Sequence, residues 1–116
     1  MYDVTSEQSY LNVRNWIESV RVGVDDECII CLIGNKVDLY PNDECRTITY
    51  KHGADLAKEF DMIFFETSAY SGLGINDSMR SLAFRLQQRE DEHLAEAMRL
   101  NKELANGARS RFCYCL

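Results

Sequence analysis

Three polar residues with complementary chemistry follow an apolar run near the start of the chain. Asn35, Lys36 and Asp38 come directly after the run 28–33, which has the length of a buried strand. The carboxylate of Asp38 offers two acceptor oxygens, and these can take a paired hydrogen bond from two adjacent N–H donors on a planar ligand. The stem of Lys36 can lie along the face of a ring. Asn35 can tie the loop to its neighbours.

Guanine is the base that fits this group. Unlike adenine, it presents a ring N–H and an amino group side by side. A site built for paired donors rejects ligands without them, because its own polar groups are then left unpaired. An ordinary polar turn is the alternative, since Asn-Lys-x-Asp also occurs by chance. The preceding strand favours the guanine site.

A second polar loop follows the next apolar run. Glu66-Thr67-Ser68-Ala69 comes after the short strand pattern 62–65. Small residues let a backbone N–H approach a ligand carbonyl, and hydroxyl groups can brace the loop. Alone, this segment would be interpreted as a Ser/Thr turn. Its place after the first loop favours a second wall of the same pocket.

The elements that position these loops alternate along the chain. Thr5, with Gln8 three positions later, predicts the capping box of a helix that ends near residue 21. Gly34 is expected to end the strand 28–33. A helix over 49–60 and the strand 62–65 follow, and a third helix begins near Ile75.

The segment after residue 88 changes in character. It is rich in charge and compatible with a helix over 89–105, with an end expected at Asn106-Gly107 and a flexible tail over 108–116. The domains expected are 1–88, a charged helical extension over 89–112, and a terminal motif at 113–116. The alternation of strands and helices predicts an α/β fold with a parallel sheet and right-handed crossovers. Because ligands bind beyond the carboxyl ends of such strands, both polar loops should lie at one edge.

Composition excludes several function classes. The chain of 116 residues fits one domain, and its net charge of -6 without a basic stripe argues against a nucleic-acid partner. The apolar runs are far shorter than a membrane span of about 20 residues. The cysteines number five, which is odd, so free intracellular thiols are expected. Cys28 and Cys31 could form a redox or zinc pair, but without a second pair core thiols are favoured.

The motifs together resemble those of the small GTPases, and of the Rab family among them. Gly-Asn-Lys-Val-Asp-Leu at 34–39 is similar to the base-recognition motif, and Glu-Thr-Ser-Ala at 66–69 is similar to the second guanine loop. Tyr-Asp-Val-Thr at 2–5, Ser9-Tyr10 and Trp16-Ile17 resemble the Rab pattern. The resemblance covers about residues 1–88.

The resemblance implies a role for each matched residue. Asn35, Lys36 and Asp38 would contact the base. Ser68 and Ala69 would brace it and supply a backbone donor. Tyr70 stands where the family usually has lysine, and its aromatic ring could pack over the base or ribose.

The resemblance also implies what the chain lacks. The phosphate loop Gly-x-x-x-x-Gly-Lys-Ser/Thr, the switch threonine, the metal-binding aspartate and the water-positioning glutamine do not occur in it. The implied fold is the C-terminal half of a P-loop NTPase (Ras-like) G domain, beginning at the fourth of six strands. The implied cofactor is GTP or GDP, with Mg2+ in the full-length parent only. GTP hydrolysis is expected of that parent and not of this chain, which has no catalytic residues.

The last four residues have the form of a lipidation motif. Cys113-Tyr114-Cys115-Leu116 matches Cys-a-a-X, and paired cysteines are common at the ends of Rab proteins, so Cys113 and Cys115 are both candidates for prenylation. An unmodified tail is the alternative. Prenylation would hold the protein on the cytosolic face of an intracellular membrane.

Two functions remain open. The first is a Rab-like switch in vesicle traffic, whose implied partners are effectors, exchange factors, activating proteins, GDP-dissociation inhibitor and escort protein. The second is a truncated, non-catalytic isoform or decoy that binds effectors or the prenylation machinery without nucleotide turnover. A flavodoxin-like domain would fit the strand order but not the two guanine motifs.

Overall fold

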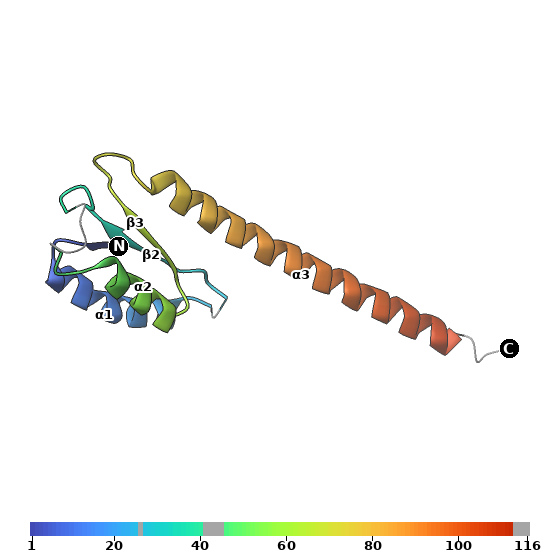
Figure 1. The fold of residues 1–116 in the computed structure, drawn as a ribbon. Coiled ribbons are helices and arrows are strands. Elements are labelled where there is room, and N and C mark those ends of the chain that lie inside the picture. Colours follow the sequence, from blue (N-terminus) through green and yellow to red (C-terminus); the bar gives the residue numbers. More distant parts are fainter. Residues whose placement is uncertain (26, 41–45, 113–116) are drawn as a thin grey trace. The chain divides into compact units, whose positions relative to one another are not determined.

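The computed structural model describes the backbone of residues 1–25, 27–40 and 46–112, and side chains up to residue 106 (Figure 1). Internal contacts divide the chain into two compact units, Met1–Ala83 and Phe84–Leu116.

A small parallel sheet forms the centre of the first unit. Its strands are β1 (Tyr2–Asp3), β2 (Cys31–Asn35) and β3 (Ile63–Thr67), in the order β1-β2-β3. Asp3 pairs with Asn35, and Asn35 pairs with Thr67, so the three strands end level with one another. The predicted α/β class with parallel strands is confirmed. The carboxyl ends of all three strands open on the same edge of the sheet.

Two helices cover one face of this sheet (Figure 1). They are α1 (Glu7–Gly23) and α2 (Tyr50–Glu59). Val13 and Ile17 of α1 are buried with Leu56 and Ala57 of α2, and Leu32 of β2 lies among them. The buried apolar core of the described residues is Tyr2, Val4, Val13, Ile17, Leu32, Val37, Ile48, Leu56 and Ala57.

The predicted start of α1 is wrong by one residue. Ser6, not Thr5, is the N-cap, and its hydroxyl accepts from the Ser9 N–H at 3.3 Å. Thr5 is engaged elsewhere, because its N–H and hydroxyl both donate to Asp3 Oδ1. Gln8 donates to Asn12 and does not close a capping box.

The central strand lies further along the chain than predicted. Gly34 belongs to the interior of β2 and does not end it. A side chain at Gly34 would meet the Tyr2 hydroxyl at 2.8 Å and Val4 at 3.2 Å, so the glycine is needed for close packing rather than for a turn. β3 is displaced in the same direction, to Ile63–Thr67, because it pairs with β2 residue by residue.

The last helix is continuous. α3 (Ile75–Phe112) extends through 89–105 as predicted, but it does not stop at Asn106-Gly107, and residues 108–112 are helical rather than a tail. One glycine costs a helix only about 1 kcal/mol, which alanines on either side of this pair can offset. No helix among the described residues has both the length and the apolar character needed to cross a bilayer.

Candidate functional site

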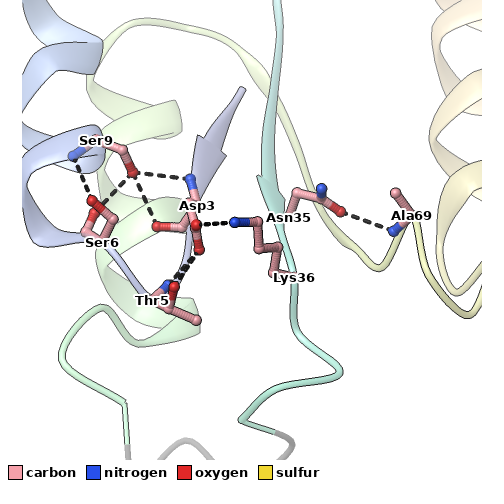
Figure 2. A network of polar contacts seen from close by, with 7 residues as sticks. All are labelled: Asp3, Thr5, Ser6, Ser9, Asn35, Lys36 and Ala69. Atoms are coloured by element: carbon pink, nitrogen blue, oxygen red, sulfur yellow. Dashed lines mark hydrogen bonds and ion pairs between the residues drawn. The ribbon is translucent and has the colours of Figure 1, made fainter.

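The two polar loops meet at the carboxyl edge of the sheet, as predicted. Asn35 Oδ1 accepts from the Ala69 N–H at 3.0 Å (Figure 2) and from the Thr67 hydroxyl at 3.1 Å. The Val37 N–H donates to the Thr67 carbonyl at 3.3 Å. Asn35 therefore fastens the second loop to the first. The Ala69 N–H, expected to face a ligand, is used inside the chain in this structure.

Asp38 is held by the second loop through one oxygen. The Ser68 hydroxyl donates to Asp38 Oδ1 at 2.6 Å, and Ser68 is fully buried whereas Asp38 is exposed. The hydroxyl also accepts from the Ser71 N–H at 3.0 Å. A short hydrogen bond to a buried group fixes the carboxylate, while its second oxygen is available to a donor from outside.

Lys36 turns the chain away from the strand in an unusual backbone conformation. Its φ is 73°, in the left-handed region that residues other than glycine rarely adopt. Its ammonium reaches back to β1 and pairs with Asp3 Oδ2 at 2.6 Å (Figure 2). Burial opposes ionisation of Asp3, but hydrogen bonds from Lys36 and Thr5 outweigh it and hold the pKa of Asp3 below its usual range.

Asp3 is itself fixed by the start of α1. Thr5 donates to Asp3 Oδ1 from its N–H at 2.9 Å and from its hydroxyl at 2.6 Å. The Asp3 N–H donates to the Ser9 hydroxyl at 2.9 Å (Figure 2). The Asp3 carbonyl accepts from the Ser6 N–H at 3.0 Å. Sequence reasoning used Asp3 only as part of a family pattern and missed this contact, which depends on the register of β1 against β2.

A buried ion pair holds the first residue of the second loop, Glu66. Arg46 donates two hydrogen bonds to the carboxylate of Glu66, at 3.1 and 3.0 Å, and the two side chains are 4% and 16% exposed. Gly74, at φ 73°, lies so close to the Glu66 carbonyl that a side chain there would collide with it. Arg46 was not predicted, because nothing near it in the sequence marks it as a partner of Glu66.

Tyr70 stands at the rim of this arrangement. It follows Ala69 directly, and it is 93% exposed. The turn that carries it is closed by the Gly72 N–H, which donates to the Ser68 carbonyl at 2.8 Å. An exposed aromatic ring therefore stands on a hydrogen-bonded turn, next to Ala69 in the sequence.

The two described cysteines differ from the expectation of core thiols. Cys28 is exposed, because β2 begins only at Cys31, and Cys31 is half-buried. Burial raises the pKa of the Cys31 thiol. Among the described residues, no group of His, Cys, Asp and Glu is placed to hold a metal ion.

Comparison with known proteins identifies the family. The Ras family model matches residues 1–88. The chain belongs to the Ras family. It is 43% identical over 91 residues to human EF-hand calcium-binding domain-containing protein 4B, covering 78% of this chain and 12% of that protein. It is 42% identical over 86 residues to zebrafish Ras and EF-hand domain-containing protein, covering 72% of this chain and 13% of the relative.

Rab-named relatives of the Ras family match over a similar stretch. The yeast Ras-related protein SEC4 is 34% identical over 93 residues, covering 80% of this chain and 41% of SEC4. Rat Ras-related protein Rab-26 is 32% identical over 96 residues, covering 83% of this chain and 36% of Rab-26. The predicted resemblance to the Rab family is confirmed. The chain spans less than half the length of these relatives.

The predicted lipidation site of this Ras-family chain lies at its carboxyl end. Cys113 and Cys115 fall outside the described residues.

Proposed function

We propose that this Ras-family chain recognises the guanine base of GTP or GDP, as the base-reading part of a Rab-like nucleotide switch. The observation that supports the proposal is the position of the Asp38 carboxylate. Its carboxylate is exposed at the carboxyl edge of the sheet, and the buried Ser68 hydroxyl holds one of its oxygens at 2.6 Å. A pre-positioned carboxylate is what a paired N–H donor requires.

The remaining residues supply complementary contacts. The stem of Lys36 offers an apolar face for a ring. Asn35 Oδ1 accepts from two donors, so the bond from Thr67 keeps the loops together when the Ala69 N–H turns to a ligand carbonyl. The base is then recognised through its two donors, its face and its carbonyl.

The sequence holds no motif for the phosphates, and the described residues hold no cluster suited to a metal ion. The motif that cradles phosphates in P-loop proteins does not occur in this chain. No acidic cluster of the described residues suits a metal ion, so we derive no step through Mg2+. The chain alone is therefore expected to bind guanine nucleotides weakly and to leave GTP intact.

Similarity to the Rab-named relatives supports a wider role as a further part of the proposal. We place the chain in a switch that acts in vesicle traffic and is held on the cytosolic face of a membrane through prenyl groups on Cys113 and Cys115. Its partners would be guanine nucleotide, Rab effectors, exchange factors, activating proteins, GDP-dissociation inhibitor and escort protein.

An exchange of the base-reading carboxylate tests the proposal. The full chain, labelled with 15N, is titrated with GDP, ADP and XDP while amide shifts are followed. The wild type should prefer GDP. Asp38→Asn should weaken GDP binding about 10- to 100-fold, the value of hydrogen bonds to a charged group.

The same variant should gain affinity for XDP, because xanthine presents a carbonyl where guanine has its amino group. Asp25→Asn makes the same change at an exposed aspartate before β2, and it should leave all three affinities unchanged. Equal affinity of the wild type for GDP and ADP would contradict the proposal.

A further inference from the structure

The backbone of Lys36 adopts a strained φ angle. A lysine at φ 73° adopts a conformation that a glycine would take without cost. Strain of this kind persists only where the surroundings impose it, and it is found at binding sites. In this chain two contacts hold the backbone and the side chain at this point. The Asn35 carbonyl accepts from the Val4 N–H at 3.0 Å, and the Lys36 ammonium pairs with Asp3 at 2.6 Å.

Hydrogen bonds fix the position of Asp3, the residue that pairs with that ammonium. Asp3 Oδ1 accepts two hydrogen bonds from Thr5, and the Asp3 N–H donates to the Ser9 hydroxyl (Figure 2). The Asp3 carbonyl accepts from the N–H of Ser6, the N-cap of α1. Oδ2 alone faces Lys36. The Asp3 side chain is 23% exposed and that of Lys36 is 53% exposed. One end of the pair is therefore anchored, and the other stays accessible from outside.

We propose that Asp3 is a positioning residue of the base site, which holds the Lys36 ammonium so that the lysine stem is presented to a purine ring before the ligand arrives. This inference rests on the proposed guanine recognition. An ammonium has three donors, so pairing with one carboxylate oxygen leaves donors for a ligand. The lysine stem is already ordered in the folded protein, so binding of the ligand does not lose the conformational entropy of this side chain.

The competing explanation is that the Asp3–Lys36 pair only stabilises the structure. The Asp3–Lys36 pair also ties β1 to the loop after β2, and its loss could disturb the whole edge. The two explanations differ in one respect. A positioning residue acts through Lys36 only, so its effect on affinity disappears when Lys36 is removed.

A double-mutant cycle on the full chain separates them, with GDP as the probe and amide shifts as the readout. The variants are Asp3→Asn, Lys36→Ala and both together. Asparagine keeps an acceptor for Thr5 but loses the charge that holds Lys36. Asp3→Asn should weaken GDP binding about three- to tenfold, the range for one immobilised side chain. In the Lys36→Ala background the same change should alter affinity less than about twofold.

Glu59→Gln is the matched control, because it removes an exposed ion pair to Arg14 that lies between α1 and α2. It should leave GDP affinity unchanged. A measurement on the wild type covers the case in which Asp3→Asn does not fold. In 13C relaxation measurements, the side-chain carbons of Lys36 should be more rigid than those of Lys51, for which no ion pair is described.

Each outcome bears on a different statement. An unchanged affinity in Asp3→Asn, an equal loss with and without Lys36, or Lys36 side-chain carbons as mobile as those of Lys51 overturns the positioning role and leaves guanine recognition standing. A wild type that binds ADP as well as GDP overturns guanine recognition, and the positioning role with it.

Discussion

Tyr70 stands where the resemblance implies a lysine. Its ring is 93% exposed on a closed turn, next to Ala69. Stacking of a base on an aromatic ring contributes about 1–3 kcal/mol. Because the ring lies at the rim, we expect the lower value, so Tyr70→Ala should weaken GDP binding about fivefold in a shift titration. Tyr70→Phe keeps the ring and should bind as the wild type does. Equal affinity of the alanine and tyrosine forms would show that the ring does not contact the nucleotide.

We expect the Arg46–Glu66 ion pair to affect the stability of the fold rather than nucleotide recognition. Arg46 and Glu66 are 4% and 16% exposed, and their hydrogen bonds are paired. Removing one partner of a buried pair costs about 3–5 kcal/mol, because the other charge stays desolvated. Glu66→Gln should lower the free energy of unfolding by about 3 kcal/mol in urea titrations.

Glu96→Gln is the matched change in an exposed pair. Glu96 and Arg99 are 54% and 66% exposed, so its effect should stay below about 1 kcal/mol. Similar losses in Glu66→Gln and Glu96→Gln would argue that the buried pair is hydrated in solution.

At this scale the sequence predicted the residues that carry recognisable chemistry, and it missed their supports. Asn35, Asp38 and Ser68 were found because they follow strands and share one edge. Asp3 and Arg46 were not, because each acts on a partner far along the chain. Asp3 meets Lys36 only once β1 is paired with β2 in the register that sets Asp3 beside Asn35.

Among the elements, α2 shows packing overriding helix propensity. Gly53 lies inside this helix, where alanine is intrinsically better by about 1 kcal/mol. A side chain there would collide with Phe64 of β3 and with the buried Tyr2 hydroxyl. Gly53→Ala should therefore destabilise the chain by about 1–3 kcal/mol, the usual cost of overpacking.

Gly23→Ala is the control, since nothing lies within 4 Å of the added carbon at the end of α1. Alanine there should stabilise by about 0.4–1 kcal/mol. Thermal unfolding followed by circular dichroism would measure both variants. A rise in melting temperature for Gly53→Ala would mean that α2 does not pack against β3 as described.

The elements were predicted better than their ends. The helix predicted over 49–60 is present as α2, with Thr49 as its N-cap. The His52 side chain accepts from the Thr49 N–H at 3.1 Å, in place of the usual Glu or Gln of a capping box. The start of α1 was predicted one residue early, because a sequence pattern cannot show that Asp3 has already bound Thr5. β2 was placed too early because Gly34 was expected to end the strand. Its role is to make room for Tyr2.

Burial differs strongly between two regions of the molecule, β2 and the segment 90–106 of α3. β2 is hydrogen-bonded to strands on both sides, and Leu32 is 3% exposed. In contrast, every residue over 90–106 of α3 is exposed. Two ion pairs in that stretch join Arg99 to Glu96 and to Glu103, and exposed pairs of this kind contribute about 0.3–0.5 kcal/mol each. Local stability follows buried contacts, so the two regions should open with very different free energies.

Hydrogen exchange measures this difference directly. In the full chain at neutral pH, the amides of β2 should exchange only when the first unit unfolds, whereas those of 90–106 should exchange through local opening, on the order of a hundredfold faster or more. Equal protection in both regions would mean that another surface covers this helix in solution. Repeating the measurement at lower protein concentration would then decide the source of the cover, since protection that falls on dilution comes from a second copy of the chain.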